Sequence, residues 1–287
     1  MTAIFKREWK SLFSGMLGYA LCAAYVLVGG LYFWVYNLLN LYPDFGYTLY
    51  GTTFAMLVFI PILTMRSLAE EHRSHTDQLL LTAPVSIPSI VAGKYLAMTA
   101  VFTVPVAILG LCPLVMRLYG TVSLPKAYGA LLGYWLLGCA GIAIGLFLSG
   151  LTDSPIVAAL ATFGVLLLSY LMPGIQSLFT VGSLLAVGIF GLLAALAGLL
   201  AGIRSRSLML GMLVFLALCA ALAALYGLRS AALTGAFSAL LGALGLFTPF
   251  ENFIYGIFSI PAMIYYLSIT ALFLFLAGQG LEKRRWN

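Results

Sequence analysis

The side chains able to do acid–base or metal chemistry gather in one short polar segment, residues 66–77. It reads Arg-Ser-Leu-Ala-Glu-Glu-His-Arg-Ser-His-Thr-Asp and contains both histidines of the chain. Histidine and carboxylate groups serve as general acids and bases and as zinc ligands. His72 and His75 could share a metal ion, but no third ligand accompanies them. We therefore predict no metal site in this segment.

Motifs for nucleotide binding and hydrolysis are missing from the sequence. Gly93-Lys94 is followed by Tyr95, and Pro88 stands where a phosphate-binding loop requires a glycine. Gly-x-Ser-x-Gly is absent, and the apolar stretches contain no paired carboxylates. These observations argue against intramembrane serine or aspartyl hydrolysis. We predict no catalytic residue and no cofactor bound by this chain.

The composition excludes a soluble enzyme domain. Apolar residues make up 63% of the chain and charged residues 8%, whereas a soluble domain has about 25% charged residues. Long unbroken apolar runs also differ from the short alternating strands of a membrane barrel. The cysteines lie in these runs without a Cys-x-x-Cys pair, so neither a disulfide framework nor a zinc site is indicated. The sequence therefore predicts an all-α, polytopic helical membrane protein.

Charge-free stretches long enough to cross a bilayer determine the number of helices. A membrane-spanning helix needs about 20 predominantly apolar residues. We expect residues 229–261 to form short helices on the outer face, because a ninth span there would move the basic C-terminal tail outside. The remaining stretches predict about eight spans in a single transmembrane domain, residues 1–287, at 15–37, 49–65, 94–116, 127–151, 156–172, 181–203, 207–228 and 262–281.

The distribution of basic residues predicts the orientation, because cytoplasmic loops of membrane proteins are enriched in lysine and arginine. With the N-terminus inside, eight spans leave only Arg117, Lys126 and Arg229 outside. Both termini are therefore expected on the cytoplasmic side of a cell membrane. The net charge of +6 then reflects topology and indicates no nucleic-acid partner. The basic residues on the inside are Lys6, Arg7, Lys10, Arg66, Arg73, Lys94, Arg204, Arg206, Lys283, Arg284 and Arg285.

Two cytoplasmic segments are expected beside the membrane core. Residues 1–14 are amphipathic, with apolar side chains on one side and lysine and arginine on the other, as in a helix that lies in the membrane interface. Residues 66–93 form a cytoplasmic loop with a charged start and an apolar end around Leu79 and Leu80. Such a loop is typical of an element that docks into a protein groove, and a solvated hairpin has a similar composition.

The spacing of glycines predicts close packing of the span at 127–151. It carries Gly129-x3-Gly133 and Gly141-x3-Gly145, and small residues at this spacing let membrane helices approach closely. We expect this helix to be buried in the bundle or at a subunit interface. Glycine is also common in membrane helices in general.

Several stretches resemble a known family. Met65 to Ser86, with the following Gly93 to Ala97, resembles the cytoplasmic coupling region of ABC-2 type transporter permeases, closest to the gliding-motility-type (GldF-like) branch. Phe5-Lys-Arg-Glu8 resembles the interfacial N-terminal helix of that branch. Tyr265 to Trp286 resembles its last span and tail, and Phe250 to Phe253 its outer-face segment.

Two departures from the family pattern accompany the resemblance. His72 and His75 stand where the family more often has a basic residue and a glycine. Residues 180–228 look additional to the usual plan of six spans, so the pore geometry of the family does not transfer to them.

The resemblance implies that this chain is the permease subunit of an exporter. The subunit itself would not be an enzyme. It would lie in membrane lipid, pair with a second permease copy or paralogue, and bind a dimer of cytoplasmic ABC ATPases, which hold ATP and magnesium. The loop and the N-terminal helix would contact the ATPase. The residues to which the resemblance assigns this ATPase coupling are Glu70, Glu71, Arg73, Leu79, Leu80 and Pro84, supported by Lys6, Arg7 and Glu8.

Two other functions stay open from the residues alone. A non-transporting scaffold or sensor would keep the ATPase contacts without substrate-dependent stimulation of hydrolysis. An autonomous secondary carrier would follow a sodium or proton gradient, although the near absence of ionisable residues inside the spans argues against it. The spans show no polar stripe, which favours a lipidic, amphipathic or peptide cargo over a small ion.

Overall fold

The computed structural model describes residues 2–74, 86–179 and 242–286. Every regular element in these residues is helical. The chain forms two compact units, one made of Met1–Leu168 with Pro249–Asn287 and the other of Ser169–Thr248. The predicted all-α fold class is confirmed for the described part of the chain.

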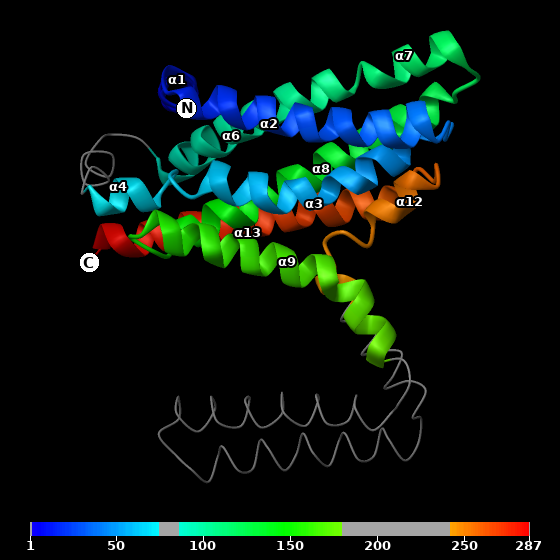
Figure 1. Ribbon diagram of the computed structural model, residues 1–287. Helices are drawn as coiled ribbons and strands as arrows, with labels where there is room; N and C mark the ends of the chain where they lie inside the picture. The colour runs from blue at the N-terminus through cyan, green and yellow to red at the C-terminus, as the bar shows by residue number, and fades with distance from the viewer. Residues whose placement is uncertain (1, 75–85, 180–241, 287) are drawn as a thin grey trace, which may run out of the picture. The chain divides into compact units, whose positions relative to one another are not determined.

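The first unit contains a bundle of long helices with shorter helices at its ends (Figure 1). The helix α9 begins in this unit and continues into the second. The elements are α1 (Thr2–Ser14), α2 (Met16–Phe33), the π-helix η1 (Trp34–Leu39), α3 (Phe45–Thr64), α4 (Ala69–Arg73), α6 (Ile87–Leu109), α7 (Cys112–Tyr119), α8 (Leu124–Gly150), α9 (Pro155–Phe179), α12 (Phe250–Ile254) and α13 (Ile260–Trp286).

Helical stretches long and apolar enough to cross a membrane agree with six of the predicted spans, so the polytopic membrane fold is confirmed. The predicted spans at 181–203 and 207–228 lie outside the described residues, as do residues 229–241 of the predicted outer-face segment. The six stretches found in the described residues are Gly18–Leu39, Phe45–Arg73, Ile87–Tyr119, Leu124–Gly150, Pro155–Gln176 and Ile260–Lys283.

Proline lies at the start of several long helices, and an internal proline does not end α9. Pro88, Pro125 and Pro155 lie in the first turn of α6, α8 and α9, where the missing N–H costs no intrahelical hydrogen bond. Pro173, at which the sequence predicted the end of a span, lies inside α9, which continues to Phe179. Membrane helices tolerate an internal proline because neighbouring groups satisfy the freed backbone.

The centre of the first unit is α8, which packs against α3, α6, α12 and α13. About 72% of its most apolar 18-residue stretch is buried, compared with 17% of the corresponding stretch of α13. The glycines of α8 allow these contacts: a Cβ on Gly133 would lie 2.6 Å from Cδ2 of Phe253, and one on Gly141 would lie 2.6 Å from Cδ1 of Ile60. A Cβ on Gly145 would lie 2.9 Å from Cβ of Thr64.

Buried aromatic rings fill the space between α2, α3, α6 and α8. The hydroxyls of Tyr25 and Tyr134 form a hydrogen bond, and Tyr134 also donates to the carbonyl of Thr52 at 3.3 Å. Phe59 and Phe102 pack against Tyr25 with ring centroids 4.7 and 6.1 Å away. The tyrosine hydroxyls therefore satisfy one another in the apolar interior, as buried polar groups must.

The connection from α2 to α3 is fixed by a buried amide. Asn37 lies in η1, and its Nδ2 donates to the carbonyl of Tyr42 at 2.8 Å, while Thr48 donates to its Oδ1. The carboxylate of Asp44 pairs with Lys126 of α8 at 2.9 Å. Asn37 therefore ties the loop to α3, and the Asp44–Lys126 pair ties it to α8.

In the described part of the second unit, Ser169 joins α9 to the segment around Leu244 and Leu246. Ser169 of α9 donates to the carbonyl of Leu244 at 2.9 Å and accepts from the backbone N–H of Leu246 at 2.6 Å. The rings of Tyr170 and Phe247 meet edge to face with centroids 5.2 Å apart.

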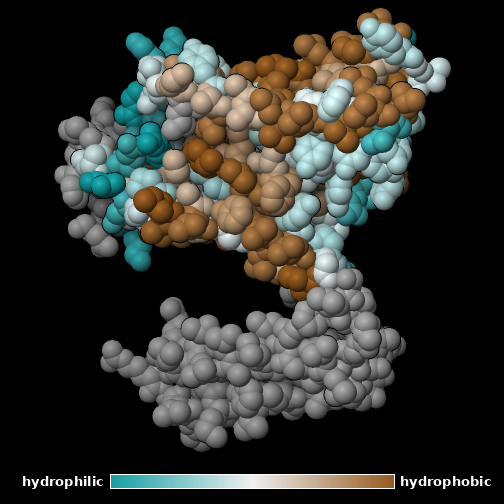
Figure 2. Space-filling model, viewed as in Figure 1, coloured by the Kyte–Doolittle hydropathy of each residue, from teal (hydrophilic) through white to brown (hydrophobic). Residues whose placement is uncertain are grey.

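Basic residues concentrate at one end of the first unit, which we call the basic end. Both chain termini, α1 and α4 lie at this end, and α7 and α12 lie at the opposite end (Figure 1). Figure 2 shows hydrophobic side chains over the middle of the helices and hydrophilic ones at both ends, the basic end included. The arrangement agrees with helices that cross a bilayer and carry their charges to its surface.

The glycines of α8 give a first prediction. Gly133→Ala places a methyl group against the buried ring of Phe253 and should cost about 1–3 kcal/mol of stability through overpacking. Gly129→Ala, one turn earlier, is the matched control, because a Cβ there meets nothing within 4 Å. It should leave stability unchanged or raise it by up to about 1 kcal/mol through helix propensity. Thermal unfolding in detergent, followed by tryptophan fluorescence, distinguishes the two, and equal midpoints would contradict the packing described.

Candidate functional site

The polar residues of the basic end meet around one buried lysine. Lys94 lies about two turns into α6, and its side chain is 1% exposed. Its Nζ donates to the carbonyl of Ser67 at 2.7 Å and lies 3.1 Å from Oε1 of Glu8 and 2.9 Å from Oε1 of Glu71. One ammonium therefore joins α6 to α1 and to the segment that follows α3.

A second cation completes the arrangement. Nη2 of Arg7 lies 2.8 Å from Oε1 of Glu8 and 2.5 Å from Oε1 of Glu71. The two carboxylates thus lie between two cations, and the four side chains have no net charge. We call Arg7, Glu8, Glu71 and Lys94 the ionic network. A buried charge is tolerated only when it is paired and hydrogen-bonded in this way.

The ionic network shifts the pKa of Glu8 and the pKa of Arg7. Burial alone raises the pKa of the Glu8 carboxyl, but attraction to Lys94 and hydrogen bonds from Arg7 and Lys94 outweigh burial and hold the pKa below its ordinary value of 4.5. The hydrogen bond to Glu8, with the negative charge of Glu71, raises the pKa of the Arg7 guanidinium against the opposing effect of burial. Both shifts favour the charged forms.

The break between α3 and α4 is bridged by a serine of α8. Oγ of Ser149 accepts hydrogen bonds from the backbone N–H of Leu68 at 3.2 Å and of Ala69 at 3.1 Å. The same hydroxyl donates to the carbonyl of Met65 at 3.3 Å. Because Ser149 is fully buried, it supplies backbone partners that water cannot supply there. The start of α4 is thereby attached to α8.

His72 of α4 lies near the connection between α8 and α9. His72 is 4% exposed, and its Nδ1 lies 3.9 Å from Oδ1 of Asp153, between α8 and α9. Among the described residues, no three histidine, cysteine, aspartate or glutamate side chains lie together as a metal site. In the described part of the chain, the charged side chains of the ionic network therefore join α1, α4 and α6.

The structure brings some of the residues singled out from the sequence together and separates others. Arg7, Glu8 and Glu71 meet in the ionic network, whereas Lys6 is exposed on α1. Glu70 and Arg73 lie on another side of α4, where they line a pocket with Arg66. Leu79, Leu80 and Pro84 lie outside the described residues. Of the four α8 glycines singled out from the sequence, Gly129 meets no neighbour, and the other three lie against Phe253, Ile60 and Thr64.

Sequence reasoning missed two residues of this site. The charge-free length places Lys94 at the boundary of a span, yet α6 begins at Ile87 and carries the lysine inside the bundle. A lysine within an apolar stretch was the signal that could have found it, because such a residue requires a carboxylate partner. Ser149 left no comparable signal, since a serine near the end of a membrane helix is ordinary.

The buried ammonium gives a second prediction. Lys94→Met leaves the Glu8 and Glu71 carboxylates facing Arg7 alone, so it should destabilise the protein by about 3–5 kcal/mol, the usual cost of breaking a buried pair. Lys10→Met removes an exposed cation from α1 and is the control. Thermal unfolding in detergent measures both. Combining Lys94→Met with Glu8→Gln should restore part of the loss, and strictly additive losses would argue against a direct interaction.

The lowered pKa of Glu8 gives a third prediction. A carboxyl with a folded-state pKa below its unfolded value contributes stability that is fully present above the unfolded value and is lost as pH falls through the folded one. Glu8→Gln should therefore be less stable than the native chain at pH 7, and this difference should shrink below about pH 4.5. Unfolding midpoints in detergent from pH 3 to pH 8 test the expectation. A difference that stays constant over this range would contradict it.

Comparison with known proteins places the chain in a family. No curated protein and no solved structure matches the chain. A family profile described as ABC-2 family transporter protein matches residues 35–187, which is just over half of the chain. The matched range covers α3, α4, α6 and α8, and with them Glu71, Lys94 and Ser149. The chain therefore belongs to the ABC-2 transporter family.

Proposed function

We propose that this chain is the membrane-spanning permease subunit of an ATP-driven ABC-2 exporter, of the gliding-motility-type branch. Its motor would be a dimer of cytoplasmic ABC ATPases that bind ATP and magnesium. A second permease copy or a paralogue would complete the membrane part. This chain would contribute no catalytic group, and its role would be to pass the movements of the ATPase to the helices around the transported substrate.

The observation that carries the proposal is the ionic network. It joins α1 and α4, the described parts of the two elements that the sequence resemblance assigns to ATPase contact, to α6 in the bundle. Ser149 attaches the same segment to α8. A movement that the ATPase imposes on α4 would therefore be transmitted directly to α6 and α8. Chains of ion pairs, hydrogen bonds and rigid helices are the structures that carry such coupling.

The basic end also determines the proposed orientation of the chain in the membrane. In the described residues, the basic end carries the cations of α1, α4, α6 and the C-terminal tail, and Arg117 and Lys126 lie toward the opposite end. By the positive-inside rule the basic end faces the cytoplasm. The ionic network would then lie in the inner half of a cell membrane, within reach of a soluble ATPase.

Purification with the native partner tests the proposal and is the fourth prediction. An ABC ATPase should co-purify with the chain, and Leu79→Asp or Leu80→Asp should abolish this association, since an unpaired charge in a docking groove costs several kcal/mol. Glu71→Gln should leave the ATPase bound but reduce permease-dependent ATP hydrolysis about five-fold or more, the lower range of couplings between sites. Hydrolysis is measured on the complex in lipid nanodiscs.

The matched control for Glu71→Gln is Glu282→Gln. Glu282 is a carboxylate near the same end of the molecule, on α13, and it pairs with no member of the ionic network in the described residues. It should leave hydrolysis unchanged. The proposal fails if no ATPase co-purifies, or if the purified chain alone hydrolyses ATP. Equal activity of both glutamate variants would leave the permease assignment standing and remove the ionic network from the coupling.

A further inference from the structure

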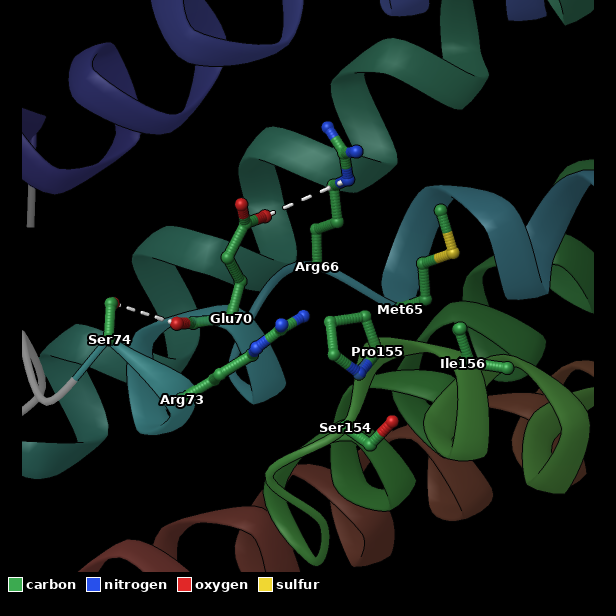
Figure 3. A pocket seen from close by; sticks show the side chains of 8 residues that line it. All are labelled: Met65, Arg66, Glu70, Arg73, Ser74, Ser154, Pro155 and Ile156. Atoms are coloured by element: carbon green, nitrogen blue, oxygen red, sulfur yellow. Dashed lines mark hydrogen bonds and ion pairs between the residues drawn. The ribbon is translucent and has the colours of Figure 1, made fainter.

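A pocket of about 480 Å³ opens at the basic end beside the ionic network (Figure 3). It lies between the segment that follows α3 and the start of α9. Arg66, Glu70 and Arg73 form its polar side, and Met65, Pro155 and Ile156 form its apolar side. None of these residues belongs to the ionic network, so the pocket is a separate feature.

The polar side of the pocket has an excess of positive charge. Two guanidinium groups and one carboxylate line this side, and the Arg66–Glu70 pair is long, with 3.7 Å between Nε of Arg66 and Oε2 of Glu70. The side chains of Arg66 and Glu70 are 55% and 56% exposed, so this pair is weak. Figure 3 shows the Arg73 side chain between Glu70 and Pro155. Two guanidinium groups at such a site can bind the oxygens of a phosphate in bidentate fashion.

The apolar side of the pocket continues onto the outer face of α9. Ile156 is 72% exposed, and Val157 and Leu160 are 53% and 65% exposed. Leu168, two turns beyond Leu160, is also exposed. In a helix that crosses a bilayer, such a face lies against acyl chains. The pocket thus joins a basic recess to a surface suited to a lipid tail.

The position of the pocket at the ends of two spans places it in the head-group layer of the membrane. Met65 follows the last residue of α3, and Pro155 is the first residue of α9, so both spans end at the pocket. Anionic head groups bind basic recesses between membrane helices on the cytoplasmic side. We propose that this pocket binds the phosphate head group of an anionic phospholipid of the inner leaflet, with one acyl chain along Ile156, Val157 and Leu160.

Charge and continuity favour a lipid over a segment of a protein partner in this pocket. An acidic protein segment would satisfy the two arginines but would leave the adjoining apolar face of α9 to be covered by other means. A phospholipid satisfies both sides at once. The inference does not depend on the coupling role of the ionic network, and it holds for any function of the chain in a membrane.

Lipid retention tests the inference and is the fifth prediction. The full chain is reconstituted in nanodiscs of equal parts phosphatidylglycerol and phosphatidylcholine with identical acyl chains, extracted in mild detergent, and analysed for bound lipid by native mass spectrometry. The native chain should retain phosphatidylglycerol in preference to phosphatidylcholine. Arg66→Gln should reduce this preference roughly five-fold, and Arg66→Gln with Arg73→Gln should reduce it further, since each basic residue near the surface contributes a comparable factor.

Lys10→Gln is the matched control, because Lys10 is an exposed cation at the same end and does not line the pocket. It should keep the native preference. Arg66 is more than half exposed, so its variant is expected to fold, and its unfolding midpoint checks this. The inference is overturned if the arginine variants retain phosphatidylglycerol as the native chain does. It is also overturned if millimolar inorganic phosphate displaces the lipid, or if the bound ATPase and not a lipid protects Arg66 from chemical modification.

Discussion

A positive charge inside an apolar helix bundle has to be neutralised where it lies. The Lys94 side chain is almost completely buried, and an isolated ion in such a place costs several kcal/mol. The carboxylates that neutralise it come from α1, whose Glu8 lies 86 residues before Lys94 in the sequence, and from α4. The requirement of one side chain therefore determines where three elements of the basic end lie.

The same requirement makes these contacts interdependent. Arg7 touches both carboxylates that Lys94 touches, so neither Glu8 nor Glu71 can move away without weakening its bonds to two cations. Arrangements of this kind change between discrete states more readily than they deform gradually. In the proposed permease, such behaviour would resist partial movements of α4 and pass complete ones on.

Much of the fold could be predicted from the sequence, because the bilayer acts on each segment separately. Charge-free length predicted six of the described helices, and the basic residues predicted which ends lie together. The partners of Lys94 could not be predicted in this way, since the sequence pattern of α6 does not reveal what lies opposite it. For the same reason, the glycine spacing predicted a packed face on α8 but did not separate Gly129 from Gly133.

The Ser149 hydroxyl stabilises the non-helical segment between α3 and α4. Ser149 binds two amides and one carbonyl of the segment from Met65 to Ala69, so this hydroxyl attaches the segment to α8. A force applied to α4 should then turn the segment about this attachment, as a lever turns about its fulcrum. The position of Ser149 would then determine how far α6 moves when α4 is displaced by a given distance.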